Sequence, residues 1–205
     1  MALPLTKQQV LQGAGWLLAN FSAEIDAAVR GKPYDMPIVC SIACKETGFI
    51  WIARSSTMTA SRLLPLLVGD ASGDYPGTSR RAFPENTAAF RAEFGPAFTN
   101  KLIVEANNAR ALRRMGPAQW VYKGYGIFQY DLQHIRRDRE FFENLLWHKI
   151  GPCFDRLTKE LDRSFAAANG NRREGVRRYN GSGPNAELYA DHVMAFAEWC
   201  KELER

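Results

Sequence analysis

The residue with the clearest chemical potential is Glu46, which closes a run of apolar residues. Ile38, Ile42 and Glu46 are spaced four apart, so on a helix the carboxylate extends a face that is otherwise apolar. The pattern predicts a helix that starts around Asp35–Pro37 and stops at Gly48, with Glu46 in its last turn. Burial and the helix dipole there both disfavour the ionised carboxylate and raise its pKa. A carboxylic acid that stays protonated near neutral pH is what cleavage of a glycosidic bond needs as its proton donor.

The same residue has a plainer interpretation. A Glu at the end of a helix is often solvated, or paired with a basic neighbour, which here would be Lys45 or Arg54. Carboxylates with a shifted pKa also occur in purely structural ion networks, so this segment alone favours the plainer interpretation.

Two later segments combine glycines with polar and aromatic side chains. Residues 124–131 read Gly-Tyr-Gly-Ile-Phe-Gln-Tyr-Asp, and residues 179–183 read Tyr-Asn-Gly-Ser-Gly. Each segment alone predicts only a turn before a helix, or the end of one. Taken in order with Glu46-Thr47, they resemble the signature of the goose-type lysozyme and lytic transglycosylase family. In that family a helix ends in Glu-Ser, a Gly-Leu-Met-Gln-like segment follows, and an Ala-Tyr-Asn-Ala-Gly-like motif comes near the C-terminus. The resemblance covers residues 37–48 and 123–205.

The resemblance implies a mostly helical, lysozyme-like fold whose cleft binds β-1,4-linked N-acetylated sugars. Glu46 would protonate the leaving glycosidic oxygen. Gln129 and Tyr179 would line the cleft, and Asn180 would shape it or touch the substrate. Thr47 replaces the family's usual Ser and keeps a hydroxyl group.

Aromatic residues make up 12% of the chain, and aromatic rings stack on the apolar faces of sugars. Tyr125 and Tyr130 lie beside the Gln-containing segment and are candidates for this contact, although most aromatic side chains belong to the core.

A second carboxylate would decide the course of the reaction. Asp131 matches the acidic residue that follows the family's Gln-containing segment, and it could position water for an inverting hydrolysis if the two carboxyl groups lie about 6.5–9.5 Å apart. Asp131 could equally be the N-cap of a helix that begins near Leu132. Goose-type enzymes carry a further Asp that is absent here, and Asp70 or Asp74 in a Gly-rich loop could replace it. Without a second carboxylate, Glu46 would act first as acid and then as base, as in lytic transglycosylases, and the product would be an internal anhydro sugar.

The elements that must position these residues are predicted to be helices. A capping box from Thr6 to Gln9 begins the first one. Apolar spacing predicts further helices at residues 84–94, 97–115, 132–149, 154–168, 174–178 and 185–202, with Leu188 facing inward in the last. No alternating strand pattern is convincing. We expect an all-α or strongly α-dominated single domain over residues 1–205. A helical insertion of about residues 53–123 would separate the catalytic Glu helix from the Gly-rich Gln segment.

Composition and the cysteines narrow the class of protein. Hydrophobic residues make up 46% and charged residues 24%, and no apolar run approaches the roughly 18 residues of a membrane span. Cys40 and Cys44, four apart, are expected to be buried free thiols, whereas a bridge between Cys153 and Cys200 stays open. The three histidines show no metal-ligand spacing, so we expect neither a metal nor a cofactor.

The net charge of +5 favours a polyanionic partner, which could be a cell wall, an anionic membrane surface or a nucleic acid. Residues 1–12 do not resemble a cleavable signal peptide. An enzyme of this kind would act at the bacterial cell wall, in the periplasm or outside the cell, for example from a phage.

The sequence therefore predicts a glycan-cleaving enzyme, a muramidase or lytic transglycosylase that acts on peptidoglycan. One alternative is a chitinase-like or chitosanase-like hydrolase on the same fold, and another is a glycan-binding module without turnover. A basic helical nucleic-acid binder is a further alternative, but no helix-turn-helix or similar module supports it, so we expect a polysaccharide partner and no nucleic acid.

Overall fold

The computed structural model describes residues 2–204, and in that range the protein is dominated by helices. Helices account for 66%, and the β-structure described is one small antiparallel sheet of three strands. The prediction of a strongly α-dominated chain is confirmed. The helices are α1 (Lys7–Val29), α2 (Met36–Trp51), α3 (Ala60–Leu63), α4 (Thr87–Leu112), α5 (Arg139–Glu143), α6 (Ile150–Ala166), α7 (Arg172–Asn180) and α8 (Pro184–Cys200). The strands are β1 (Val68–Gly69), β2 (Gly124–Tyr125) and β3 (Tyr130–Asp131).

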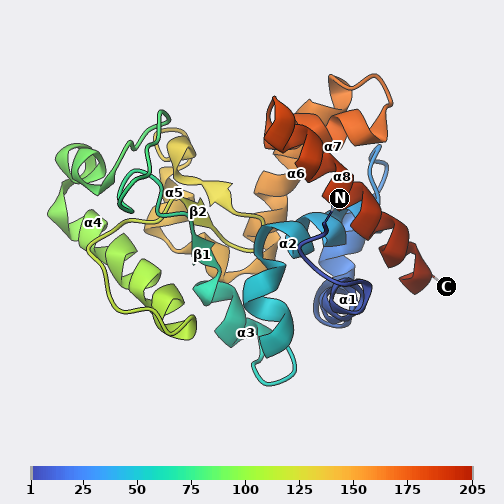
Figure 1. Ribbon diagram of the computed structural model, residues 1–205, viewed down its shortest axis with the longest axis horizontal. Helices are drawn as coiled ribbons and strands as arrows, with labels where there is room; N and C mark the ends of the chain where they lie inside the picture. Colours follow the sequence, from blue (N-terminus) through green and yellow to red (C-terminus); the bar gives the residue numbers. More distant parts are fainter. Residues whose placement is uncertain (1, 205) are drawn as a thin grey trace. The chain divides into compact units, whose positions relative to one another are not determined.

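The chain forms two compact units (Figure 1). The terminal unit comprises Met1–Met58 and Phe154–Arg205, and the middle unit comprises Thr59–Cys153. The predicted insertion, residues 53–123, begins at the end of the first segment of the terminal unit and otherwise belongs to the middle unit. The division of residues 1–205 into a single domain with an insertion at about residues 53–123 stays a prediction.

The terminal unit is built around α2, which packs against α1 and α8 (Figure 1). Ile38 and Ile42 of α2 are fully buried, as their spacing predicts. The predicted capping box begins α1: Thr6 Oγ1 accepts from the Gln9 backbone N–H at 3.3 Å, and the Gln9 side chain accepts from the Thr6 N–H at 2.8 Å. These two bonds satisfy backbone groups that the helix itself leaves unpaired.

The predicted stop of α2 at Gly48 is wrong, because the helix continues to Trp51. Gly48 instead allows close packing: a Cβ atom there would lie 2.9 Å from the terminal carbons of both Leu5 and Ile52. Glu46 therefore lies more than one turn before the helix end. The effect of the helix dipole falls off within the last turn, so burial is the main cause of a raised pKa.

The segment Met36–Arg54 is long and apolar enough to meet the criterion for a membrane-spanning helix, with a mean hydropathy of 1.3. However, 72% of the window is buried inside the protein, and the core helix of a folded unit has the same composition. The absence of a membrane span stays a prediction.

The middle unit contains the small sheet, in the order β1-β2-β3 with antiparallel pairing. Val68 pairs with Tyr125, which pairs in turn with Tyr130. The sequence shows no convincing alternating pattern, because strands of two residues are too short to produce one.

The predicted helix at residues 132–149 is also wrong. Two short 3-10 turns, Leu132–His134 and Leu146–His148, flank the five-residue α5. Leu145 has a left-handed backbone with φ of 53°, which no helix interior accommodates. The two helices predicted at 84–94 and 97–115 are joined in α4 and are separated by a kink at Gly95, whose φ is 79°.

All four cysteines are buried and free. The prediction for Cys40 and Cys44 is confirmed. The bridge between Cys153 and Cys200 is not formed, and Cys200 Sγ lies instead 3.7 Å from the Ser41 hydroxyl.

Candidate active site

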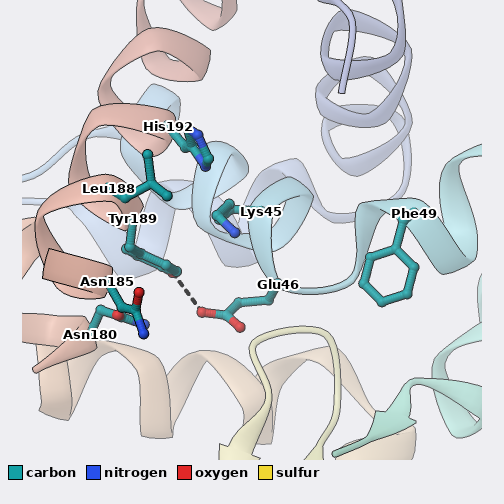
Figure 2. A pocket seen from close by; sticks show the side chains of 8 residues that line it. All are labelled: Lys45, Glu46, Phe49, Asn180, Asn185, Leu188, Tyr189 and His192. Carbon is teal, nitrogen blue, oxygen red and sulfur yellow. Dashed lines mark hydrogen bonds between the residues drawn. The ribbon is translucent and has the colours of Figure 1, made fainter. Parts of the chain in front are cut away.

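Glu46 lies in a pocket of about 440 Å³ within the terminal unit (Figure 2). Helix α2 contributes Lys45, Glu46 and Phe49 to its lining. The end of α7 and the start of α8 contribute the other lining residues, which are Asn180, Asn185, Leu188, Tyr189 and His192. The pocket thus joins the predicted acid to the segment that contains the Tyr-Asn-Gly-Ser-Gly motif.

The Glu46 carboxyl group is half-buried and is held by one short hydrogen bond. The Tyr189 hydroxyl donates to Glu46 Oε1 at 2.6 Å, as the dashed line in Figure 2 marks. Burial raises the pKa of Glu46, while the Tyr189 bond and the nearby charge of Lys45 lower it, and the net shift is upward. The plainer interpretation offered either a solvated carboxylate or an ion pair with Lys45 or Arg54, and within residues 2–204 Glu46 makes no ion pair.

Helix α8 presents its part of the pocket from a single face. It begins at Pro184, after Gly183 has turned the chain with a φ of 83°. Asn185, Tyr189 and His192 recur at intervals of four and three residues, so their side chains lie on one side of the helix.

Leu188 lies on the same side and is 45% exposed at the pocket, so the prediction that it faces inward is wrong. Sequence reasoning missed Tyr189, Asn185 and His192 as site residues. The signal that could have found them is this polar and aromatic face directly after the Tyr-Asn-Gly-Ser-Gly motif.

The motif itself brings Tyr179 and Asn180 to Glu46. Both residues end α7, where Gly181 turns the chain with a φ of 122°. The ring of Tyr179 lies 6.3 Å from the ring of Tyr189, and burial together with the charge of Glu46 raises its pKa. Two residues expected in the cleft therefore do lie beside the predicted acid.

Thr47, the neighbour of Glu46, is buried, and its hydroxyl forms hydrogen bonds within α2. Its hydroxyl donates to the Ala43 carbonyl at 3.3 Å and accepts from Trp51 Nε1 at 3.1 Å. These bonds give the hydroxyl a structural role, and a role in substrate binding stays a prediction.

The other predicted site residues belong to the middle unit. Gln129 follows a tight turn between β2 and β3, with a left-handed φ of 52°. Its side-chain amide donates to the carbonyls of Leu67 at 3.2 Å and Gly126 at 2.8 Å. A Cβ atom on Gly69 would lie 2.8 Å from Gln129 Oε1. The Gln129 side chain therefore stabilises the turn between β2 and β3 through its two hydrogen bonds, and Gly69 leaves space for it because it has no Cβ atom.

Tyr125 and Tyr130 belong to an aromatic cluster of the middle unit. Tyr125 is buried, edge-on to Phe142 at 5.3 Å and to Trp147 at 4.7 Å. The half-buried ring of Tyr130 stacks on His134 at 4.7 Å. The burial of Tyr125 leaves Tyr130 as the better candidate for contact with a sugar.

All three candidate second carboxylates pair with basic side chains. Asp70 and Asp131 share Arg80, and Asp131 also accepts from the Gln133 N–H at 2.7 Å. Asp131 is therefore an N-cap, as its plainer interpretation proposed, although the element that it caps is a 3-10 turn rather than a long helix.

Asp74 pairs with Lys123, whose side chain is completely buried. Burial lowers the pKa of Lys123, and the Asp74 carboxylate partly opposes that shift. Asp74 also accepts from the backbone N–H and the hydroxyl of Thr87, so it ties the loop to the start of α4.

Within residues 2–204, no group of three or more His, Cys, Asp or Glu side chains is placed to hold a metal ion. The lining of the pocket offers carboxyl, amide, phenol, imidazole and amine groups. No family model, no curated protein and no solved structure matches this chain, so the functional argument rests on the motifs and on the geometry around Glu46.

Proposed function

We propose that the protein is a glycan-cleaving enzyme of the lysozyme-like type, with Glu46 as its general acid and peptidoglycan as its first substrate. The observation that carries this proposal is the environment of Glu46, a half-buried carboxyl group with a raised pKa in an open pocket. The order of the three motifs and the helix-dominated architecture support the same assignment.

The hydrogen bond from Tyr189 orients the acid. Because the phenol donates to Oε1, the proton of the neutral carboxyl group sits on Oε2. That oxygen would donate to the glycosidic oxygen as the sugar leaves, and the same bond from Tyr189 would stabilise the carboxylate that results.

The rest of the pocket supplies groups suited to an N-acetylated sugar. The amides of Asn180 and Asn185 can donate to and accept from hydroxyl and acetamido groups. Phe49, 66% exposed at the pocket, offers an aromatic ring to the apolar face of a pyranose. Tyr179 would line the site beside Glu46, and Gln129 and Tyr130 remain proposed contacts from the middle unit.

The ion pairs in the middle unit favour transglycosylation over hydrolysis. Asp70 and Asp131 are engaged with Arg80, and Asp74 is engaged with Lys123. A carboxylate held in such pairs has fewer lone pairs free to accept a hydrogen bond from water than an unpaired one. In the transglycosylase route Glu46 protonates the leaving oxygen and then accepts the proton of a sugar hydroxyl, which attacks the anomeric carbon and closes the internal anhydro ring.

The test is mass spectrometry of the products formed from purified peptidoglycan and from chitin oligomers. Glu46→Gln cannot donate a proton, so we expect it to fold and to lose about 10²–10⁴-fold in rate. Glu198→Gln, at a 70% exposed position of α8, is the matched control and should keep full activity.

Each outcome has a distinct meaning. Anhydro products would support transglycosylation, whereas reducing ends would show that water is the acceptor and return a role to Asp131, Asp70 or Asp74. If chitin oligomers were cleaved and peptidoglycan were not, chitin would replace peptidoglycan as the proposed substrate. Normal turnover by Glu46→Gln, or no product from any polymer, would overturn the proposed function, and the second result would favour a glycan-binding module.

A further inference from the structure

The lining of the Glu46 pocket includes one ammonium group, that of Lys45. Lys45 precedes Glu46 on α2 and is half-buried, with its Nζ 5.4 Å from the centre of the Tyr189 ring (Figure 2). Within residues 2–204 Lys45 makes no ion pair, whereas most of the basic side chains around α7 are paired with Glu or Asp. Its charge is close enough to influence both Glu46 and His192.

Glu46, Tyr189 and His192 are the other ionisable groups that line the pocket. Burial raises the pKa of the Glu46 carboxyl and of the Tyr189 phenol. Burial and the charge of Lys45 lower the pKa of His192, which is 7% exposed at the pocket, while the Ala2 backbone and the Asp191 carboxylate act in the opposite direction. Glu46 is the one carboxyl group among the lining residues, so no carboxylate of the lining opposes the charge of Lys45 once Glu46 holds the proton that it donates.

We propose that Lys45 is a specificity-determining residue, whose ammonium binds a carboxylate carried by the glycan next to the bond that Glu46 protonates. This inference rests on the proposed function, because the carboxylate must belong to a chain that reaches Glu46. An ammonium–carboxylate contact is a charge-assisted hydrogen bond, and it gains strength in a pocket from which the ligand displaces water. The exposed Leu188 and Phe49 would meanwhile contact apolar parts of the same sugar.

Two parts of an anionic glycan could supply this carboxylate: an acid attached directly to the sugar ring, or the end of an attached peptide. Three small probes separate these sources. N-acetylglucosamine is neutral, N-acetylmuramic acid adds a carboxylate through an ether at the ring, and N-acetylmuramoyl-L-alanyl-D-isoglutamine carries its carboxylate on a peptide.

The experiment measures the dissociation constant of each probe by NMR titration of isotope-labelled protein, with the His192 ring signals as a reporter beside Lys45. We expect wild-type protein to bind one of the acidic probes about fivefold or more tightly than N-acetylglucosamine. Lys45→Met should abolish this preference without changing the affinity for N-acetylglucosamine, and Lys45→Arg should retain it. Lys159→Met is the matched control, because it removes the same charge from an exposed position on α6 and should retain the preference.

Equal affinity of wild-type protein for all three probes, or a preference that survives in Lys45→Met, would overturn the role of Lys45. Cleavage assays run in parallel keep the two proposals apart. Cleavage of a polymer without any preference for acidic probes would leave the proposed function intact and remove Lys45 from recognition. A preference that depends on Lys45, without cleavage of any polymer, would uphold the carboxylate site and contradict the enzymatic function.

Discussion

At the scale of single residues, the pKa of Glu46 depends on opposing influences. Burial disfavours the charged form of its carboxyl group, whereas the hydrogen bond from Tyr189 and the charge of Lys45 favour that form. Since a general acid works only while protonated, the balance between them sets the pH above which activity is lost.

Replacing Tyr189 by Phe tests this balance. The change removes the bond that stabilises the ionised carboxylate, so the pKa of Glu46 rises further and the alkaline limb of the rate profile moves to higher pH. We expect the maximum rate to change by less than about tenfold, because the acid itself remains. Activity measured across the pH range checks this. Tyr34→Phe removes a hydroxyl that donates to Asp162 at 2.9 Å and should leave the profile unchanged. If the alkaline limb of the rate profile of Tyr189→Phe moved to lower pH, that result would contradict the assigned role of Tyr189.

The raised pKa of Glu46 also predicts how stability depends on pH. The folded protein holds this proton above 4.5, the ordinary pKa at which the unfolded chain releases it. The contribution of Glu46 to the free energy of unfolding therefore falls as pH rises from 4.5 through the folded pKa. Glu46→Gln removes this penalty and keeps an oxygen that can accept from Tyr189.

We expect Glu46→Gln to gain stability over wild type as the pH rises, with little difference below pH 4.5. Urea unfolding at a series of pH values measures this difference. Glu198→Gln, the same substitution at an exposed position of α8, serves as the control. A constant gap between Glu46→Gln and wild type at every pH would mean that burial does not perturb this carboxyl group.

The sequence could predict Glu46 but not its partner. The four-residue spacing from Ile38 and Ile42 identifies an acid on an apolar face, and this is local information. Tyr189 lies 143 residues further along the chain, so only the packing of α8 on α2 brings its hydroxyl to the carboxyl group. Asp131 shows the reverse case, because its local role as a cap was visible and the ion pair with Arg80 was not.

At the scale of elements, the position of α2 depends on how closely α1 approaches it. Gly13 of α1 lies at the crossing, where a Cβ atom would lie 3.0 Å from Cys44 Sγ and from the ring of Trp51. Gly15, two residues further along, has nothing within 4 Å of the same added atom. The two glycines therefore separate the effect of packing from that of helix propensity.

Gly15→Ala should stabilise the protein by about 0.5–1 kcal/mol, because alanine is the better helix former. Gly13→Ala gains the same propensity but must displace a rigid indole, and such overpacking costs about 1–3 kcal/mol. We expect Gly13→Ala to be less stable than Gly15→Ala by that amount. Denaturant unfolding of both variants measures the difference. Equal stabilisation by both would show that α1 and α2 do not pack this tightly.

Helices with clear ends were predictable, and short elements were not. The capping box at Thr6 and the apolar spacing of α1 specify that helix locally. The segment 132–149 has enough apolar residues for a helix, yet it folds into α5 and two 3-10 turns around a left-handed Leu145. Burial of Phe141, Phe142 and Trp147 in the middle unit decides that conformation. The apolar periodicity of the sequence carries no information about such long-range packing.

At the scale of the whole molecule, the two ends of the chain form one unit and its centre forms another. Each unit has buried apolar residues of its own, such as Ile38 and Phe196 in the terminal unit and Phe90 and Phe142 in the middle unit. Units with separate cores can open separately, so a defect in one need not unfold the other to the same extent. The middle unit provides a sensitive position for testing this.

Lys123 is completely buried in the middle unit and is neutralised there by Asp74. Asp74→Asn leaves an uncompensated ammonium, and breaking a buried pair in this way costs about 3–5 kcal/mol. We expect hydrogen exchange to accelerate mainly in residues 59–153, with smaller changes in the terminal unit. The double variant Asp74→Asn/Lys123→Met removes both charges and should recover much of the lost stability, because no unpaired charge remains. If the double variant is no more stable than Asp74→Asn, the pair is not the source of the loss. If exchange accelerates equally in both units, they unfold as one cooperative structure, and the two cores are coupled more strongly than their separate packing indicates.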